Sequence, residues 1–381
     1  MLASRDSGCG KFDFMMDLRL LVLSVGTRVG QNVLTTLNGR RDGLVLMATS
    51  SVANEPALFD FDVVYRVPPT AAEADAFERA LLDIMDREGV DLVIPCRDDD
   101  VELIASLRDR RPEFARRLLC GSAAPAGVIS DKWLSAEFSA RHGLPFAASI
   151  IQGSDGERAA FVARHGFPLV AKPRRGYASL GVYMLWNETQ LRRTLDQDAY
   201  VVQQFLGDSR TVADYLAAIE ARGIPLHHTF QGPRHSIQAL IAPDGAIAHV
   251  MSIRIVSDRR RSKWVGLDTD PAATEIGTRC AEAFSEAGWR GPLNIQCQRA
   301  PDGRLLIHEF NGRFTGATFE RWLLGCDEVG AAVERFTGRR IPSGHAPAPA
   351  ALEAFESVVG RAADPANVAM LERNGVWRRP R

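Results

Sequence analysis

Short apolar runs alternate with helix-like patterns through the first third of the chain. A helical pattern follows residue 30, a second covers 71–88, and a third begins near residue 100. Because strands that alternate with helices form parallel sheets, this region predicts a parallel sheet with helices on both faces. The predicted strands are 18–25, 43–48, 63–67 and 90–95.

Two glycines, Gly26 and Gly30, follow the first predicted strand. The third glycine of the Gly-x-Gly-x-x-Gly dinucleotide fingerprint is missing, and Thr49-Ser50-Ser51 stands where an acidic residue would hold a ribose. A tight strand-to-helix turn is therefore the favoured interpretation, and a nicotinamide dehydrogenase is the minor one.

The rest of the chain combines returning strands with amphipathic helices. The segment 166–182 predicts a strand, a glycine loop and a second strand, and 200–206 predicts another strand. Pro-Asp-Gly turns at 243–245 and 301–303 lie between apolar runs, so both predict hairpins. The C-terminal end looks helical and peripheral. Further helices are predicted over 131–143, 155–165, 187–195, 211–222, 272–288, 318–324 and 327–337.

The apolar run from Leu305 to Phe314 ends in alternating polar residues, Glu309, Asn311 and Arg313. Alternate residues of a strand share one face, so these side chains should converge. The hairpin at 301–303 would bring Gln296 beside Glu309 and Asn311. Three oxygen donors on neighbouring strands suit Mg²⁺, which often takes its remaining ligands from phosphates and water.

Two other stretches are candidates for ligand binding. Asp98 to Asp100 come at the end of the fourth strand, where open α/β sheets bind ligands. Capping of the next helix is the favoured interpretation, with acceptor recognition as the alternative. Lys172 ends an apolar strand, where a lysine is costly unless it is paired. A phosphate would supply that pair, although an ordinary hairpin is an equal interpretation.

Composition narrows the possible partners. The chain has 381 residues, with Lys+Arg 46, Asp+Glu 47 and a formal net charge of -1. This balance lacks the concentrated charge that nucleic-acid or membrane partners require, and no apolar run reaches the roughly 18 residues of a membrane span. The six cysteines are scattered and include no Cys-x-x-Cys pair, as in a reduced, cytoplasmic protein.

An ordered set of motifs runs along the chain. It consists of Asp131-Lys132 before a helix, Phe167-Pro-Leu-Val-Ala-Lys172-Pro before a glycine loop, Val201-Val-Gln-Gln-Phe-Leu206, and Asn294-Ile-Gln296 before His308-Glu-Phe-Asn-Gly-Arg313. The set resembles the ATP-grasp superfamily, in its carbamoyl-phosphate-synthase-like branch. The resemblance implies an α/β fold with these parts: a tail (1–17), a Rossmann-like pre-ATP-grasp domain (18–125), a two-subdomain α+β ATP-grasp domain (126–342) with a lid at about 144–205, and a C-terminal extension (343–381).

The resemblance also implies residue roles around ATP. Lys132 and Lys172 match the basic residues that contact phosphate, and Arg313 matches the arginine that steadies the transferred phosphoryl group. The resemblance implies that Gln296, Glu309 and Asn311 are the ligands of Mg²⁺. It implies two ions, with Mn²⁺ as a substitute. The implied phosphate loop and adenine hinge contain Arg174, Arg175, Gly176, Ser179, Gly181, Gln203, Gln204, Phe205 and Leu206.

The implied activity is that of an ADP-forming carboxylate–amine ligase with small-molecule substrates, and a homodimer is the default assembly. Arg254 and Lys263 join Arg313 as catalytic candidates, and Arg254 and Arg321 are candidates for pairing with substrate carboxylates. Bicarbonate activation, as in carbamoyl-phosphate or carboxylase subunits, is an alternative. A regulatory nucleotide-binding protein is another, because many family members carry Glu where Gln204 stands and 208–232 looks like an insertion.

Overall fold

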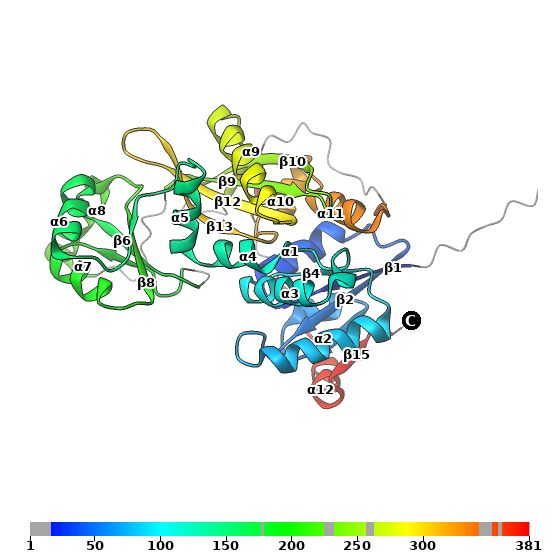
Figure 1. The fold of residues 1–381 in the computed structure, drawn as a ribbon. Coiled ribbons are helices and arrows are strands. Elements are labelled where there is room, and N and C mark those ends of the chain that lie inside the picture. The colour runs from blue at the N-terminus through cyan, green and yellow to red at the C-terminus, as the bar shows by residue number, and fades with distance from the viewer. Residues whose placement is uncertain are drawn as a thin grey trace, which may run out of the picture.

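The protein is a mixed α/β structure with three sheets (Figure 1). The computed structural model describes residues 17–176, 179–224, 232–256, 263–342, 353–356 and 360–380. Most of the predicted tail, much of the basic run 258–264 and most of the connector after Pro342 lie outside these ranges. Within them, no helix combines the length and the apolar character needed to span a membrane.

The first sheet confirms the predicted parallel arrangement. Its strand order is β15-β3-β2-β1-β4, and β1 to β4 are parallel. Successive residues of β1 enter two separate cores, one with α2 and α3 and one with α1, α11 and α12. Helices therefore cover both faces. The elements are β1 (Leu18–Val22), α1 (Arg28–Leu37), β2 (Leu44–Ser50), η1 (Pro56–Asp60), β3 (Val63–Arg66), α2 (Ala74–Glu88), β4 (Leu92–Ile94), α3 (Asp98–Arg110), η2 (Pro112–Phe114), α11 (Glu328–Thr337), α12 (Pro365–Asn374) and β15 (Val376–Arg378).

The sequence suggested that the C-terminal segment is peripheral, but part of it belongs to the first sheet. α12 is helical as expected, but the short strand β15 pairs antiparallel with β3 and completes the first sheet. Trp377 of β15 is 3% exposed and packs in the same core as Leu371 of α12. Such a short strand carries too little pattern to be recognised before its partner is known.

The turn after β1 supports the structural interpretation of Gly30. Thr27 caps α1 by accepting a hydrogen bond from the Gly30 amide. A Cβ at Gly30 would lie 2.7 Å from the Val25 Cα, so the helix can approach the strand only because this residue is glycine. The close approach explains Gly30 without a dinucleotide.

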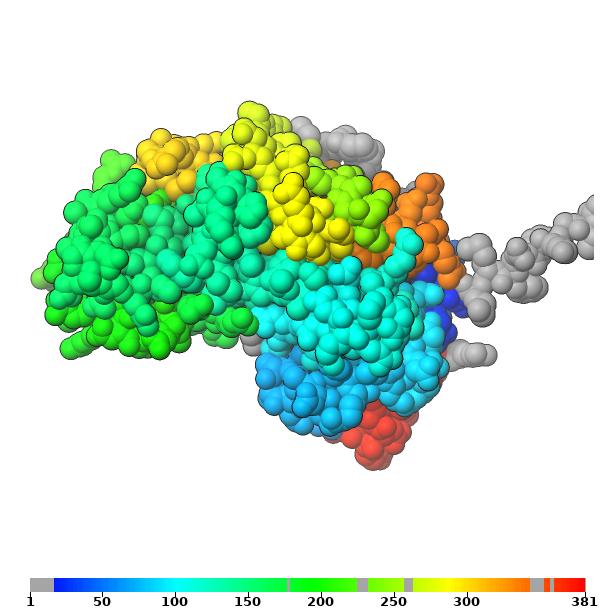
Figure 2. All heavy atoms as spheres, viewed as in Figure 1, coloured from blue at the N-terminus to red at the C-terminus, as the bar shows by residue number. Residues whose placement is uncertain are grey.

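A second, antiparallel sheet lies in the segment predicted as the lid, called the lid sheet below, and projects from the rest of the molecule (Figure 2). Its strand order is β5-β8-β6-β7, and α6 and α7 pack on it. The predicted helix after the hinge strand is present as α8. The elements are β5 (Ser149–Ile150), α6 (Asp155–His165), β6 (Leu169–Pro173), β7 (Tyr183–Leu185), α7 (Glu188–Leu195), β8 (Tyr200–Gln204) and α8 (Ser209–Arg222).

The third sheet has the order β13-β12-β9-β10-β11-β14. It confirms both predicted hairpins: Gln296 lies opposite Glu309, and Asn294 lies opposite Asn311. Helix α4 and strands β11 and β14 were not predicted. The elements are α4 (Ala123–Ser130), α5 (Lys132–Arg141), β9 (Arg234–Ile241), β10 (Ile247–Val256), β11 (Trp264–Leu267), α9 (Pro271–Glu286), β12 (Gly291–Arg299), β13 (Leu305–Asn311), α10 (Thr318–Leu323) and β14 (Glu353–Phe355).

Candidate active site

A cleft of about 560 Å³ lies between the lid sheet and the third sheet. Strands β6 and β8 supply one wall, and the β12–β13 hairpin supplies the other. Twelve of the predicted site residues line it: Lys132, Lys172, Gly176, Ser179, Gln203, Gln204, Phe205, Leu206, Gln296, Glu309, Asn311 and Arg313. The structure thus brings together residues that are far apart in the sequence.

The hairpin wall carries the oxygen donors. Glu309, Asn311 and Arg313 face the cleft together, and the Arg313 Nη2 donates a hydrogen bond to the Asn311 Oδ1 at 3.1 Å. Gln296 faces the same space from the paired position on β12. This set of one carboxylate and two amide oxygens is chemically suited to Mg²⁺.

Arg313 is held by a residue of the first sheet's domain. Its Nε and Nη2 donate to the two carboxylate oxygens of Asp98, at 2.9 and 3.1 Å. Burial disfavours the charge on Arg313, but Asp98 and Glu309 outweigh it and raise the pKa of Arg313. The prediction that Asp98 or Asp99 caps the helix was wrong, because Arg97 is the N-cap of α3 and Asp100 completes its capping box. Asp98 lies in the first turn of α3, where it orients the cleft arginine.

Two lysines face the hairpin wall. The Lys132 Nζ lies 3.8 Å from the Glu309 Oε1 and donates to the Gly176 carbonyl at 3.2 Å. Lys132 begins α5, whose first amides are capped by the side chain of Asp131. Burial lowers the pKa of Lys172 to about 8; Glu309 opposes this shift and Lys132 adds to it. An anion between the two ammonium groups would relieve their repulsion.

Several buried polar atoms in the cleft have no hydrogen-bond partner among the described residues. They include both ring nitrogens of His308, the Asn311 Nδ2 and the Gln203 Oε1. Burial, and next the charge of Lys172, lower the pKa of His308 well below its ordinary value, so the ring is neutral. Because buried polar atoms are rarely left unpaired, these atoms indicate that the cleft receives a polar ligand.

The glycine loop after β6 contributes only part of its predicted phosphate contacts to the cleft. Gly176 and Ser179 line the cleft, whereas Arg174 pairs with Asp131 at 2.7 Å and Arg175 pairs with Glu102 at 2.8 Å. Gly181 lies outside the lining, where a Cβ would lie 3.0 Å from the Pro173 Cγ. Residues 177 and 178 lie outside the described ranges.

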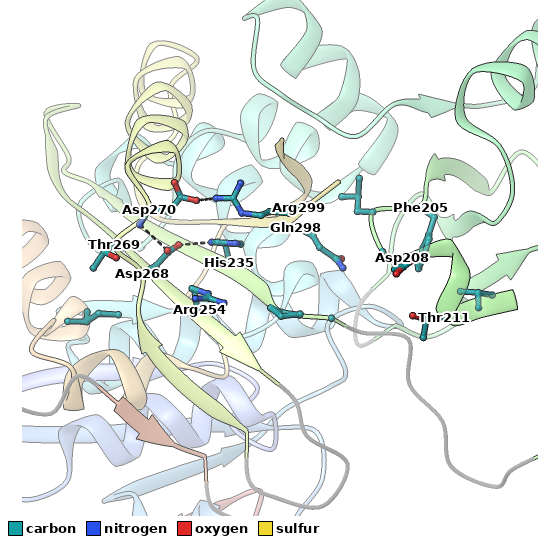
Figure 3. A pocket seen from close by; sticks show the side chains of 16 residues that line it. Phe205, Asp208, Thr211, His235, Arg254, Asp268, Thr269, Asp270, Gln298 and Arg299 are labelled. Atoms are coloured by element: carbon teal, nitrogen blue, oxygen red, sulfur yellow. Dashed lines mark hydrogen bonds and ion pairs between the residues drawn. The ribbon is translucent and has the colours of Figure 1, made fainter. Parts of the chain in front are cut away.

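Arg254 lies in a second cavity of about 690 Å³, which shares Phe205, Leu206 and Gln298 with the cleft (Figure 3). His235, Asp268 and Asp270 also line this cavity and could be mistaken for a metal site. Asp268 instead accepts hydrogen bonds from His235 and Ser252, both at 2.7 Å. Asp270 pairs with Arg299 and caps α9. This network already satisfies both carboxylates.

Lys263 and Arg321 lie away from the cleft lining. The Lys263 Nζ pairs with the Glu356 Oε2 at 3.3 Å. Arg321 is 0% exposed, pairs with Glu328 at 3.4 Å and donates to the Ser236 Oγ at 2.7 Å. The prediction that Arg321 binds a substrate carboxylate was therefore wrong, because a fully enclosed guanidinium that already has partners cannot reach a substrate.

Sequence reasoning missed several residues of the cleft, among them Arg234, Gln298 and His308. His308 and Gln298 belong to the hairpin strands, and alternation alone could have placed Gln298 on the same face as Gln296. Arg234 starts β9 and lies beside β12 in the sheet, which no local pattern indicates.

No protein-family model matches the chain, and no curated protein matches it in sequence. Solved structures match the chain in fold. The N5-carboxyaminoimidazole synthetase from Staphylococcus aureus, complexed with ADP, aligns with a TM-score of 0.63 at 10% identity over 86% of this chain and 79% of that chain. The biotin carboxylase from Campylobacter jejuni, in a beta-gamma-ATP complex, aligns with a TM-score of 0.61 at 15% identity over 86% and 72%.

A third structure is the biotin carboxylase domain dimer of the Hydrogenobacter thermophilus 2-oxoglutarate carboxylase, solved with MgADP, ADP and bicarbonate. It aligns with a TM-score of 0.58 at 15% identity over 86% of this chain and 71% of that chain. At sequence identities this low, the TM-scores establish a common fold and no more. They confirm the architecture that the motifs implied.

Proposed function

We propose, on the premise that this chain has the ATP-grasp fold, that its cleft is the active site of an ATP-dependent, ADP-forming ligase. The carboxylate of one small molecule would attack the γ-phosphorus of ATP, forming an acyl phosphate and releasing ADP. The nitrogen of an amine would then attack the acyl carbon, phosphate would leave, and the nitrogen would lose a proton. An amide or peptide-like bond results.

One observation carries this proposal: oxygen donors and an arginine on one wall of the cleft face two lysines. Phosphoryl transfer needs positioning and charge neutralisation more than covalent chemistry. Gln296, Glu309 and Asn311 would hold Mg²⁺, with Mn²⁺ as a substitute. When bound, the metal would neutralise phosphate charge and polarise the transferred group. The orphaned buried atoms support the presence of a polar ligand.

The protein's own groups would divide the remaining work. Lys132 and Lys172 would hold phosphate oxygens, and Arg313, oriented by Asp98, would stabilise charge that develops during transfer. Backbone groups from Gln203 to Leu206 would receive the base. Gly176 and Ser179 would close over the phosphates and exclude water from the reactive acyl phosphate.

Bicarbonate is the second candidate for the activated carboxylate. It is favoured by the likeness to the biotin carboxylase domain that was solved with bicarbonate. The two candidates share the first step and differ in the size of the carboxylate substrate. A cytoplasmic location and a homodimer remain part of the proposal. Free thiols at all cysteines of the described residues support the former.

An ADP-release assay tests the proposal. Purified protein is incubated with Mg-ATP and a panel of carboxylate and amine pairs, with and without bicarbonate. We expect ADP only when a suitable pair, or bicarbonate and an amine, is present. A Glu309→Gln preparation controls for contaminating ATPases. If the protein binds Mg-ATP but releases no ADP in any combination, the ligase proposal is wrong and a regulatory nucleotide-binding role takes its place.

We expect Asp98→Asn to lower kcat about tenfold while the Kd for Mg-ATP changes less than twofold. The amide keeps the shape of the carboxylate, but the hydrogen bonds that hold Arg313 lose their charge assistance, worth about 1.4 kcal/mol. Steady-state ADP release and calorimetric ATP binding measure the two quantities.

Asp99→Asn is the matched control. Asp99 lies in the same helical turn and pairs with Arg97. Among the described residues Arg313 makes its hydrogen bonds with Asp98, Asn311 and the Phe314 carbonyl and not with Asp99, so the kcat of Asp99→Asn should stay near that of the wild type. Equal losses in both variants would show that the effect comes from the helix terminus and not from Arg313.

A further inference from the structure

Three cations come together where the starts of α1, β9 and β11 meet: Arg28, Arg234 and Lys263. Burial is the largest cause of the lowered pKa of both Arg234 and Lys263, and the charge of Arg28 is the next cause for each. Arg28 and Lys263 pair with the same carboxylate, Glu356, and the starts of β9 and β11 flank the end of β10, so the three groups lie close together. Of the three, only Lys263 was a candidate site residue in the sequence analysis.

The nearby carboxylates neutralise this group only in part. Glu356 pairs with both Arg28 and Lys263. Glu320 is 5% exposed and lies close to the same cations, but its Oε2 has no hydrogen-bond partner among the described residues. Arg234 has no carboxylate within 4.0 Å in the described part of the chain, and its Nε is buried without a partner. This partly buried guanidinium therefore has no ion-pair partner among the described residues, which is costly.

The group adjoins the reacting end of the cleft. Arg234 lines the cleft, and Glu309 raises its pKa against the effects of burial and Arg28. Arg28 lies along the loop that follows Arg313, because a Cβ at Gly316 would lie 2.9 Å from the Arg28 Nε. Arg28 also begins α1, whose N-terminus favours negative charge. The first domain and the third sheet thus face one space with excess positive charge.

We infer that Arg28, Arg234 and Lys263 form a subsite for an oxyanion carried by one of the two joined substrates. That substrate has a carboxylate or a phosphate in addition to its reacting group. The inference rests on the proposed function, since it identifies the substrate class of the same site. Guanidinium groups bind both oxyanions through paired hydrogen bonds, so the cluster specifies the charge and leaves two chemical sources.

Binding of two probes tests the subsite in the full chain. The triphosphate site is first saturated with Mg²⁺ and a non-hydrolysable ATP analogue, so that the probes cannot occupy it. Inorganic phosphate and succinate are then titrated separately by calorimetry at constant ionic strength. We expect saturable binding of at least one probe. Binding of phosphate alone identifies a phosphate-bearing substrate, and binding of succinate alone identifies one with a second carboxylate.

Variants link the binding to the cluster. Arg28→Ala and, separately, Lys263→Gln should raise the Kd for the bound probe about tenfold or more, and Arg28→Lys should cause a smaller rise. All three should bind the ATP analogue within twofold of the wild type. Arg110→Ala is the matched control, because it removes an arginine that pairs with Glu78 on the surface of the first domain. Its Kd for the probe should not change.

Two outcomes would overturn the inference: the wild type binds neither probe, or folded Arg28→Ala and Lys263→Gln bind the probe as tightly as the wild type. Circular dichroism establishes that each variant is folded. The inference and the proposed function fail separately. Absence of ADP release with intact probe binding would remove the ligase and keep the oxyanion site, whereas ADP release with unaffected variants would remove only the oxyanion site.

Discussion

Replacing Glu309 with Gln is expected to lower kcat/KM for ADP release roughly a thousandfold, a loss of about 4 kcal/mol in transition-state stabilisation. Glu309 is the single carboxylate in the predicted metal set, and the amides of Gln296 and Asn311 bring no charge. It also lies 3.8 Å from Lys132. The amide keeps the volume and one oxygen, so the change isolates the charge.

Titration with Mg²⁺ separates the two ways in which this variant can fail. If Glu309 binds the metal, the Mg²⁺ concentration that gives half-maximal activity should rise together with the loss of rate. Glu78→Gln is the control, because it removes a carboxylate that pairs with Arg110 outside the cleft. Activity of Glu309→Gln within tenfold of the wild type at low Mg²⁺ would exclude Glu309 as the principal metal ligand.

The hairpin that carries Glu309 was predictable because its signals are local. A Pro-Asp-Gly turn separates two apolar runs, and the period of two on a strand places Glu309 and Asn311 on one face. The pairing of Gln296 with Glu309 follows from that turn, and the structure has it. The same reasoning located Lys172 at the end of a strand. Each case depends on fewer than about twenty consecutive residues.

The partners of the charged residues were not predictable in this way. Arg313 pairs with Asp98 across 215 positions of sequence, and Arg174 pairs with Asp131 instead of lining the cleft. Such choices depend on how separate sheets dock, and charge patterns in a sequence do not encode docking. Arg28 illustrates the limit, since it looked like an ordinary residue of a strand-to-helix turn. Its proximity to Arg234 and Lys263 arises only when the first domain meets the third sheet.

Replacing Lys172 with Met is expected to weaken Mg-ATP binding roughly tenfold to a hundredfold, because a charge-assisted contact to phosphate is lost.

The lowered pKa of Lys172 also predicts that the affinity for Mg-ATP depends on pH. Burial lowers its pKa from 10.5 to about 8, with Lys132 adding to the shift and Glu309 opposing it. In the free protein the ammonium therefore loses its proton as pH rises through about 8, and the Kd for Mg-ATP should rise above that pH. A lysine with a depressed pKa destabilises the free fold below about pH 8, and this penalty fades between about pH 8 and 10.5.

Calorimetric titrations of Mg-ATP between about pH 6.5 and about pH 9.5 measure this dependence. The range extends roughly 1.5 units below and above the lowered pKa of Lys172. Lys172→Arg is the matched variant: a guanidinium stays protonated across the range, so its Kd should remain flat where the wild type weakens. Lysine-directed labelling gives a second readout, because the chain contains few lysines, namely Lys11, Lys132, Lys172 and Lys263. Lys172 should react fastest near pH 8, and Mg-ATP should protect it, since only the neutral amine is nucleophilic. A flat Kd in the wild type together with slow labelling would show that Lys172 keeps an ordinary pKa, and the phosphate contact would then have to rest on Lys132.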